Sequence, residues 1–279
     1  MIARSDHDQE EINRNNAEFW NELCGTQLAR QLGITDDSPE SLKKFDNWYM
    51  DFYPYLYDHI MFAEMKGQRV LEVGLGYGTV AQKLLDAGAR YSGLDIAAGP
   101  VAMVEHRCLL AGIGDADIRQ ASILDPPFAD GSFDRLVAIG CLHHTGNLPE
   151  AIKVVWRLLR PGGEASFMVY SAVSYRQFKE APLATLKRKL ATGGVAYVAP
   201  NSMERQRAAY DVNAQGAAAP QTEFVSPAEL RWLCRDFSKV AIRSENIGMG
   251  GLLGRLPRPL LCRLFGPVVG LDLYCRVVK

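Results

Sequence analysis

Arg69-Val70-Leu71-Glu72-Val73-Gly74-Leu75-Gly76-Tyr77-Gly78 is the stretch that decides the fold of this chain. A short apolar strand leads into glycines at alternate positions, and apolar residues then recur at helical spacing from Val80 to Leu85. A strand, a tight glycine turn and a helix together let backbone N–H groups approach a ligand closely. We therefore predict a nucleotide-like ligand at the end of this strand.

The spacing of the glycines and the position of Glu72 narrow the chemistry of that ligand. A dinucleotide-binding turn reads G-x-G-x-x-G and places a pyrophosphate at the helix N-terminus. This chain reads G-x-G-x-G, and Glu72 stands two residues before the first glycine. Because a carboxylate so close to a phosphate would repel it, the pattern favours a cationic or amine-bearing ligand.

Composition restricts the class of protein. The chain has 279 residues, of which 48% are hydrophobic and 23% charged, and its net charge is −1. This is an ordinary globular composition, and a general nucleic-acid binder would carry a basic excess, so we expect no nucleic-acid partner. The six cysteines are scattered without a C-x-x-C pair, which predicts reduced thiols and no metal site. The polar N-terminus and the lack of a run of about 20 apolar residues predict a cytoplasmic protein with no integral membrane segment.

The chain divides into four predicted regions. Residues 67–170 alternate strand and helix patterns, which implies a mostly parallel sheet with helices on both faces. Residues 1–66 read as an aromatic-rich helical lid. Residues 171–225 carry Gly and Pro loop signals and are too long for a simple connection, so we expect a substrate or lid insertion. Residues 226–279 open on a helix start, Ser226-Pro227-Ala228-Glu229, and supply two further strands that complete the sheet.

The run from Glu72 to Gly78 resembles motif I of the class I S-adenosylmethionine-dependent methyltransferases, in particular the small-molecule members of the methyltransferase type 11 kind. Further segments agree in order and spacing: Gly93-Leu94-Asp95-Ile96, the run 124–134, Ala138-Ile139-Gly140-Cys141-Leu142-His143-His144, and the Pro-Gly-Gly turn at 157–164. The resemblance implies an α/β, Rossmann-like, doubly wound sheet of seven strands with an antiparallel last strand. It also implies S-adenosylmethionine as the methyl donor and S-adenosylhomocysteine as the product.

The same resemblance assigns the cofactor-binding residues. It places Glu72 near the amino group of the cofactor, and it gives Asp95 the ribose hydroxyls. Ser122 stands where many members of the family carry an Asp, and a hydroxyl can still hydrogen-bond adenine. The full set of cofactor residues implied is Glu72, Gly74, Gly76, Gly78, Asp95, Ile96, Ser122, Ile123 and Gly140.

Candidate residues for the acceptor side are less specific. His144, and after it His143, are candidates for a general base because imidazole has a suitable pKa, although a structural loop role is the alternative. Tyr175 is a third catalytic candidate. Trp20, Trp48, Tyr49 and Tyr170 are predicted to wall the substrate pocket, although the aromatic helix carrying Trp48 and Tyr49 would equally pack on the core. Asp211 and Glu223 are acidic residues of the insertion, for which we favour a surface or loop position.

The predicted activity is methyl transfer to a small organic acceptor, a specialised metabolite, by in-line displacement in which proximity and orientation dominate. A lipid, isoprenoid or quinone-like carbon acceptor is the first alternative. A reductase that uses NADP is another, since Tyr175 is followed four residues later by Lys179, and a non-catalytic cofactor-binding protein is the last. Residues 252–269 are apolar with arginines, but their prolines argue against a long amphipathic helix. We expect a packed cap or a homo-oligomer contact there.

Overall fold

A seven-stranded sheet forms the centre of the computed structural model, which describes residues 6–191, 202–248 and 257–279. The strand order is β3-β2-β1-β4-β5-β7-β6, and β7 runs antiparallel to both of its neighbours while the other pairs are parallel. The predicted doubly wound sheet with an antiparallel last strand is confirmed. The strands are β1 (Arg69–Val73), β2 (Arg90–Asp95), β3 (Asp117–Gln120), β4 (Phe133–Ile139), β5 (Leu159–Tyr170), β6 (Lys239–Glu245) and β7 (Asp272–Val278).

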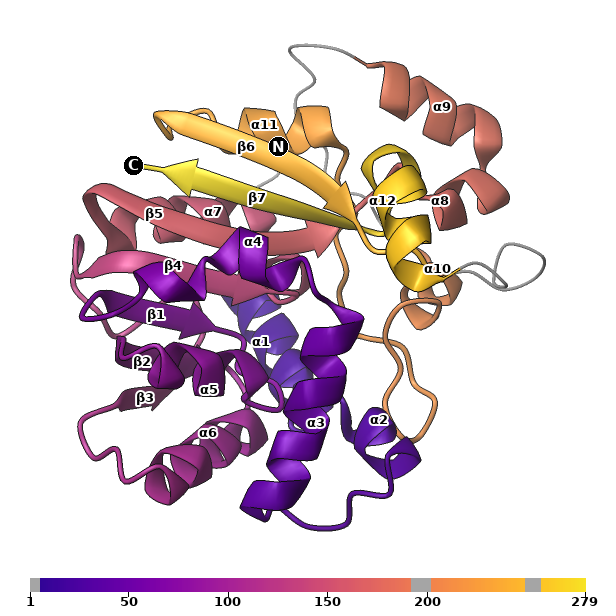
Figure 1. Cartoon of the computed structure of the whole chain (residues 1–279). Coiled ribbons are helices and arrows are strands. Elements are labelled where there is room, and N and C mark those ends of the chain that lie inside the picture. The colour runs from indigo at the N-terminus through magenta and orange to yellow at the C-terminus, as the bar shows by residue number, and fades with distance from the viewer. Residues whose placement is uncertain (1–5, 192–201, 249–256) are drawn as a thin grey trace.

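Helices cover both faces of this sheet and build a separate apolar core on each (Figure 1). One core packs α7 (Leu148–Leu158) and α11 (Pro227–Leu233) against β1, β4, β5 and β7. The other core holds residues of α3 (Pro39–Phe52), α4 (Leu56–Ile60), α5 (Thr79–Asp86) and α6 (Ala98–Leu110). The central strands are therefore buried on both sides, as parallel strands are in α/β proteins.

The remaining helices gather mainly beyond the carboxyl ends of the parallel strands, at the right of Figure 1. Most of them come from the predicted insertion and from the segment between β6 and β7. They are α8 (Tyr175–Glu180), α9 (Pro182–Leu190), α10 (Glu204–Ala208) and α12 (Arg258–Val269), while α1 (Asp6–Trp20) and α2 (Thr26–Gln31) precede α3. Two 3₁₀ turns, η1 (Phe62–Glu64) and η2 (Leu142–His144), complete the helical elements of the described chain.

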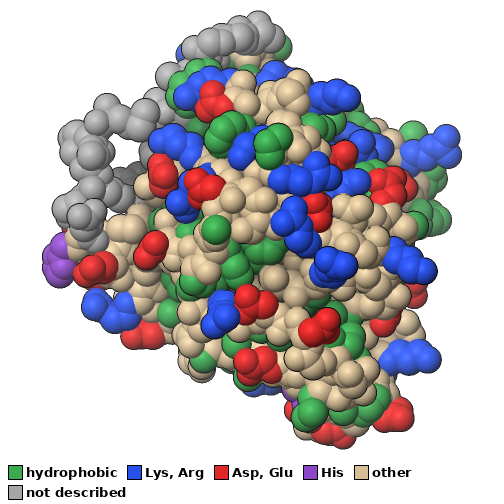
Figure 2. Space-filling model, turned by 90° about the vertical axis from the view of Figure 1, so that its left-hand side faces the viewer, with side chains coloured by type: hydrophobic (Ala, Val, Ile, Leu, Met, Phe, Trp, Pro, Cys, Tyr) green, Lys and Arg blue, Asp and Glu red, His purple; other side chains and the backbone are tan. Residues whose placement is uncertain are grey.

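The opposite end of the sheet, where the parallel strands begin, carries both signs of charge interspersed (Figure 2). Asp134 at the start of β4 illustrates the pairing, because it binds Arg69 at 3.1 Å and Arg160 at 2.5 Å. Such mixed, solvated ion pairs contribute little to stability and indicate no ligand.

The helix start predicted at Ser226 is confirmed. The Ser226 hydroxyl accepts from the Glu229 backbone N–H at 3.3 Å, and the Glu229 carboxylate accepts from the Ser226 N–H at 2.7 Å. Pro227 occupies the first turn, where its missing N–H costs nothing. This reciprocal cap sets the start of α11 and so the approach of the chain to β6.

One strand is longer than the sequence pattern predicts. The pattern predicts a strand over Glu164–Tyr170, but β5 begins at Leu159, because Leu159 pairs with Phe133 and the backbone of Gly162 and Gly163 hydrogen-bonds to Lys279. The described part of the segment 252–269 forms the 12-residue helix α12. Pro259 lies in the first turn, where no N–H is needed, and Pro267 lies close to the end of the helix. Among the described residues, no helix is both long and apolar enough to cross a membrane.

A buried ion pair fastens α3 to α6 beside the glycine turn. The Arg107 guanidinium binds both carboxylate oxygens of Asp46, at 2.8 and 2.9 Å, and both side chains are almost fully buried. Arg107 also donates to the Tyr77 carbonyl at 3.0 Å, while Asp46 accepts from the Thr79 hydroxyl at 2.6 Å. The two charged side chains therefore hydrogen-bond to each other, to the glycine turn and to the start of α5.

Breaking this pair should be strongly destabilising. We expect Arg107→Met to lower the free energy of unfolding by about 3–5 kcal/mol, because it leaves the Asp46 carboxylate buried without a cation. The matched control is Arg119→Met, which removes an exposed partner of Asp117 and should cost less than about 1 kcal/mol. Urea denaturation of both variants measures the difference, and equal losses would contradict the role given to the Arg107 pair.

Candidate active site

The glycine turn after β1 has backbone angles that favour glycine at each of its three positions. Gly74, Gly76 and Gly78 have φ values of +78°, +52° and +77°. A Cβ at Gly74 would come within 2.5 Å of the Cys141 Cβ, and one at Gly78 within 2.7 Å of the Arg107 side chain. The turn is therefore pressed between the β4–α7 connection and α6, and its backbone lines a cavity in front of it.

That cavity has a volume of about 330 Å³, within the range of small-molecule sites. It lies at the carboxyl ends of the parallel strands, the usual ligand position in open α/β sheets. Most of the residues predicted for the site line it: Trp20, Tyr49, Glu72, Gly74, Gly76, Asp95, Ile96, Ser122, Ile123, Gly140, His144 and Tyr170.

Two carboxyl groups stand beside the glycine turn. Glu72 is 3% exposed and accepts a hydrogen bond from the Tyr91 hydroxyl at 2.7 Å, and burial raises its pKa to about 8. Asp95 accepts from the backbone N–H groups of Leu75 at 2.7 Å and Ala97 at 2.9 Å. Burial raises the pKa of Asp95 to about 6, although these backbone bonds lower it. Asp95 therefore both shapes the turn and presents its carboxyl to the cavity.

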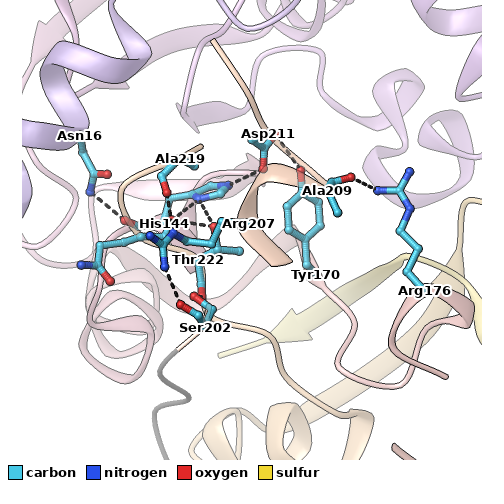
Figure 3. A network of polar contacts seen from close by, with 11 residues as sticks. Asn16, His144, Tyr170, Arg176, Ser202, Arg207, Ala209, Asp211, Ala219 and Thr222 are labelled. Atoms are coloured by element: carbon cyan, nitrogen blue, oxygen red, sulfur yellow. Dashed lines mark hydrogen bonds and ion pairs between the residues drawn. The ribbon is translucent and has the colours of Figure 1, made fainter. Parts of the chain in front are cut away.

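His144 lies across the cavity from these carboxyls and has one ring nitrogen without a partner. Its Nδ1 lies 2.6 Å from the Gln221 carbonyl oxygen, which accepts only, so Nδ1 carries a proton. Its Nε2 has no hydrogen-bond partner among the described residues and lies 3.6 Å from an Asp211 carboxylate oxygen (Figure 3). Burial lowers the pKa of His144 and so favours the neutral ring, which carries a lone pair on its buried Nε2.

Asp211 is the acidic residue next to His144, and it lies in a loop, one of the two positions that the sequence favoured for it, but in a buried one. The other Asp211 oxygen accepts from the Tyr170 hydroxyl at 3.1 Å, so the carboxylate stands between the imidazole and the phenol (Figure 3). Its loop is held by Arg207, which donates to the carbonyls of Ala219 and Ser202. Burial raises the pKa of Asp211, and the nearby His144 opposes that shift. No sequence signal marks this residue, because its contacts come from an irregular loop.

A second acid, Asp272, was not among the residues singled out from the sequence. It begins β7, is 2% exposed and accepts from the Asn246 side-chain amide at 2.9 Å. Burial raises its pKa to about 7, and the Asp211 charge adds to that shift. Asn246 has a φ of +66°, which turns the chain at the end of β6 toward the cavity. Tyr53, Tyr210 and Tyr274 line the same region.

Four predicted site residues do not line the cavity. The His143 ring is fully buried between the rings of His144 and Tyr170, with centroids at 4.1 and 4.2 Å. Trp48 stacks on Phe52 at 4.7 Å. The Tyr175 hydroxyl donates to the Gly248 carbonyl. Gly78 caps α5 from behind the turn, and the acidic candidate Glu223 is buried and accepts from the Leu148 N–H at 2.8 Å.

Comparison with known proteins places this site in a family. A methyltransferase-domain model matches residues 71–167. Sterol methyltransferase-like 1 of Botryococcus braunii is 37% identical over 114 residues, which are 40% of this chain and 29% of that protein. Ubiquinone biosynthesis O-methyltransferase of Paracidovorax citrulli is 30% identical over 106 residues, which are 38% of this chain and 44% of that protein. The chain thus spans less than half the length of these curated relatives.

Residues 71–167 belong to the class I S-adenosylmethionine-dependent methyltransferases. Solved structures agree on the fold of this chain: an S-adenosylmethionine-dependent methyltransferase from Mesorhizobium loti has a TM-score of 0.50 at 18% identity, over 77% of this chain and 93% of that one. The cyclase SpnF has the same TM-score at 14% identity, over 88% and 84%. Because a cyclase shares the fold, the activity must be argued from the site.

The residues of the site fit S-adenosylmethionine, the cofactor of this family. The glycine turn leaves backbone space that a Cβ would occupy, and the Asp95 carboxyl stands at the end of β2. Glu72 offers a carboxyl group for an amine, and Ser122 offers a hydroxyl farther along the cavity. No Lys or Arg of the described chain lines the cavity to bind a pyrophosphate, which disfavours a dinucleotide.

Substitution of Gly74 should reveal how tightly the turn is enclosed. We expect Gly74→Ala to destabilise the protein by more than Gly112→Ala. Both residues have positive φ, which costs about 1–2 kcal/mol for alanine, but a Cβ at Gly112 meets nothing within 4 Å. The contact with Cys141 should add about 1–3 kcal/mol. Urea unfolding measures both losses, and equal values would show that the turn yields freely.

The raised pKa of Glu72 predicts a pH dependence. Its pKa rises from 4.5 to about 8 on folding, so between these values the folded protein holds a proton that the unfolded chain has lost. The free energy of unfolding therefore falls as pH rises, by up to about 1.4 kcal/mol per pH unit from this group. Glu72→Gln removes the titration, so its stability relative to the parent should rise between pH 5 and pH 8. Parallel pH profiles in urea unfolding would contradict this.

Proposed function

We propose that this methyltransferase transfers a methyl group from S-adenosylmethionine to a small organic acceptor bound beside His144 and Asp211. The observation that carries the proposal is that one cavity joins the glycine turn and Asp95 to the unpartnered Nε2 of His144. A cofactor site and a proton-accepting group thus share one enclosed space. Because the chain spans only part of its relatives, the activity is argued from this geometry.

The cofactor would be held by residues at one end of the cavity. Glu72 would bind the amino group, Asp95 the ribose hydroxyls, and Ile96 and Ser122 the adenine. When bound, S-adenosylmethionine supplies a methyl group on a sulfonium sulfur, and transfer of that methyl group leaves a neutral thioether. The protein need not protonate that leaving group, so its residues act by orienting the acceptor and by excluding water.

His144 is placed to take a proton from the acceptor. Its Nδ1 proton is fixed toward Gln221, so Nε2 is free to accept an O–H or N–H of the acceptor. Asp211 would then stabilise the imidazolium, and the Tyr170 hydroxyl holds Asp211 in place. This polar wall favours an oxygen or nitrogen nucleophile over the carbon acceptors of a lipid or isoprenoid. Trp20, whose ring lies 4.8 Å from that of His144, closes the cavity on the side of α1.

Calorimetry with two ligands tests the proposed class. The full chain should bind S-adenosylhomocysteine, and it should not bind NADP, because no cation among the described lining residues would meet the phosphates. Binding of NADP without any response to S-adenosylhomocysteine would overturn the proposal in favour of a reductase. Glu72→Gln should bind S-adenosylhomocysteine about tenfold more weakly, because an amide cannot take on the negative charge that a bound ammonium group favours at Glu72.

The pairing of His144 with Asp211 makes a separate prediction. Asp211 raises the pKa of His144 against the effect of burial, so Asp211→Asn should lower the pKa of that imidazole. NMR titration of the imidazole C–H protons measures the shift. Asp130→Asn, which removes an exposed carboxylate of a surface ion pair with Arg157, is the control and should leave His144 unchanged. An unshifted His144 in Asp211→Asn would sink the assigned pairing.

A further inference from the structure

We infer that the acceptor carries an ammonium group, and that Asp272 binds it on the cavity wall that also holds His144 and Asp211. This inference rests on the proposed function and names the class of its substrate. The nucleophile of the acceptor would face His144, and its cationic end would face Asp272. The carboxyl groups of Asp211 and Asp272 both belong to segments outside the matched methyltransferase domain.

The Asp272 carboxylate lies in the cavity with no cationic partner. One of its oxygens accepts from the Asn246 amide at 2.9 Å, and among the described residues it forms no ion pair with a Lys or Arg, although the charges of Arg176 and Arg258 lower its pKa from farther away. A carboxylate that is 2% exposed and unpaired is costly, because burial favours its neutral form. A cationic ligand that enters the cavity would relieve that cost.

The nearest arginines are held in other contacts. Arg258 donates to the Asn246 side-chain oxygen at 2.9 Å and to the Phe52 carbonyl, and its guanidinium lies 3.6 Å above the Phe52 ring. Arg176 donates to the Ala209 carbonyl and lies 4.8 Å from the Tyr210 ring. Neither lines the cavity. Arg258 instead fixes Asn246, so that the Asn246 amide points its N–H at Asp272.

The walls around Asp272 are aromatic. Tyr53, Tyr210 and Tyr274 line this end, and Tyr49 lies between it and the cofactor end, with its ring centroid 4.8 Å from that of Tyr53. Aromatic faces attract ammonium groups, and the attraction grows when water is excluded. Carboxylates together with tyrosine rings, and no Lys or Arg among the described lining residues, form a surface that favours cations over anions.

A second feature of this wall is a pair of buried polar atoms without hydrogen-bond partners among the described residues. His144 is 4% exposed and lines the cavity, yet its Nε2 has no hydrogen-bond partner in the described structure, and neither has the nearest Asp211 oxygen. Two acceptor atoms 3.6 Å apart need a donor, and an O–H or N–H of the acceptor supplies it. Tyr170 links the two ends, because it pairs with Asp272 across the sheet and donates to Asp211.

Three probes of one size separate the charge of the ligand from its shape. Tyramine carries a phenol and an ammonium group, tyrosol replaces the ammonium by a hydroxyl, and 4-hydroxyphenylacetate replaces it by a carboxylate. Calorimetry on the full chain, saturated with S-adenosylhomocysteine, should show tyramine binding at least about tenfold more tightly than tyrosol. 4-Hydroxyphenylacetate should bind most weakly of the three.

Two variants test whether Asp272 causes the preference for tyramine over tyrosol. Asp272→Asn should bring the affinity for tyramine to within about threefold of that for tyrosol, while S-adenosylhomocysteine binds as in the parent. Asp130→Asn removes the same charge from the surface and should keep the preference of the parent. A preference retained in Asp272→Asn would overturn the assignment of Asp272.

The outcomes for the two proposals are distinct. If the parent binds S-adenosylhomocysteine but shows no preference for tyramine, or binds none of the probes, the ammonium inference is overturned and the proposed function stands. If the parent does not bind S-adenosylhomocysteine, the proposed function itself fails. The comparison of probes on the parent requires no variant, so it decides the question even if Asp272→Asn does not fold.

Discussion

The glycine turn between β1 and α5 is the constraint on which the rest of the site depends. Its left-handed backbone is held from two sides: Asp95 accepts the Leu75 N–H, and Arg107 packs against Gly78 while it binds Asp46. The first contact comes from the end of β2 and the second from α6, which follows it. A side chain at Gly74 or a loss of Arg107 would therefore disturb the turn, the end of β2 and the α3–α6 contact together.

Buried carboxyl groups, with no Lys or Arg among the described lining residues, give the cavity its chemical character. Glu72, Asp95, Asp211 and Asp272 all line it, and burial raises the pKa of each of these carboxyl groups. Two of them stand at the cofactor end and two at the acceptor end. A cavity of this kind favours ligands that bring positive charge or hydrogen-bond donors with them. The cofactor of the family brings both, and the acceptor inferred here brings them again.

The parts that could be predicted from sequence are those with a local signal. The glycine turn, Glu72 and Asp95 follow from a short motif, and the order of strands follows from the alternation of patterns between residues 67 and 170. For the aromatic helix α3, the prediction of pocket residues was only partly right. Phe45 and Tyr49, one helical turn apart, line the cavity, while Trp48 and Phe52 form the neighbouring row and stack on each other. Helical periodicity separates these rows but does not say which one faces the site.

The acceptor side could not be predicted because its contacts join distant and irregular segments. Asp211 meets His144 from a loop with no periodic pattern, and Asp272 enters the cavity only because β7 pairs with β5 in the register that sets it beside Tyr170. His143 and His144 are neighbours in a 3₁₀ turn, and only the packing decides that His143 is enclosed and His144 lines the cavity. Such choices depend on tertiary contacts that one sequence does not display.

A crystal structure with S-adenosylhomocysteine bound would test the central claim most directly. The account predicts density for the ligand along the glycine turn, with its ribose at Asp95 and its sulfur facing the wall of His144 and Asp211. Density elsewhere on the chain, or a sulfur turned away from that wall, would contradict the account.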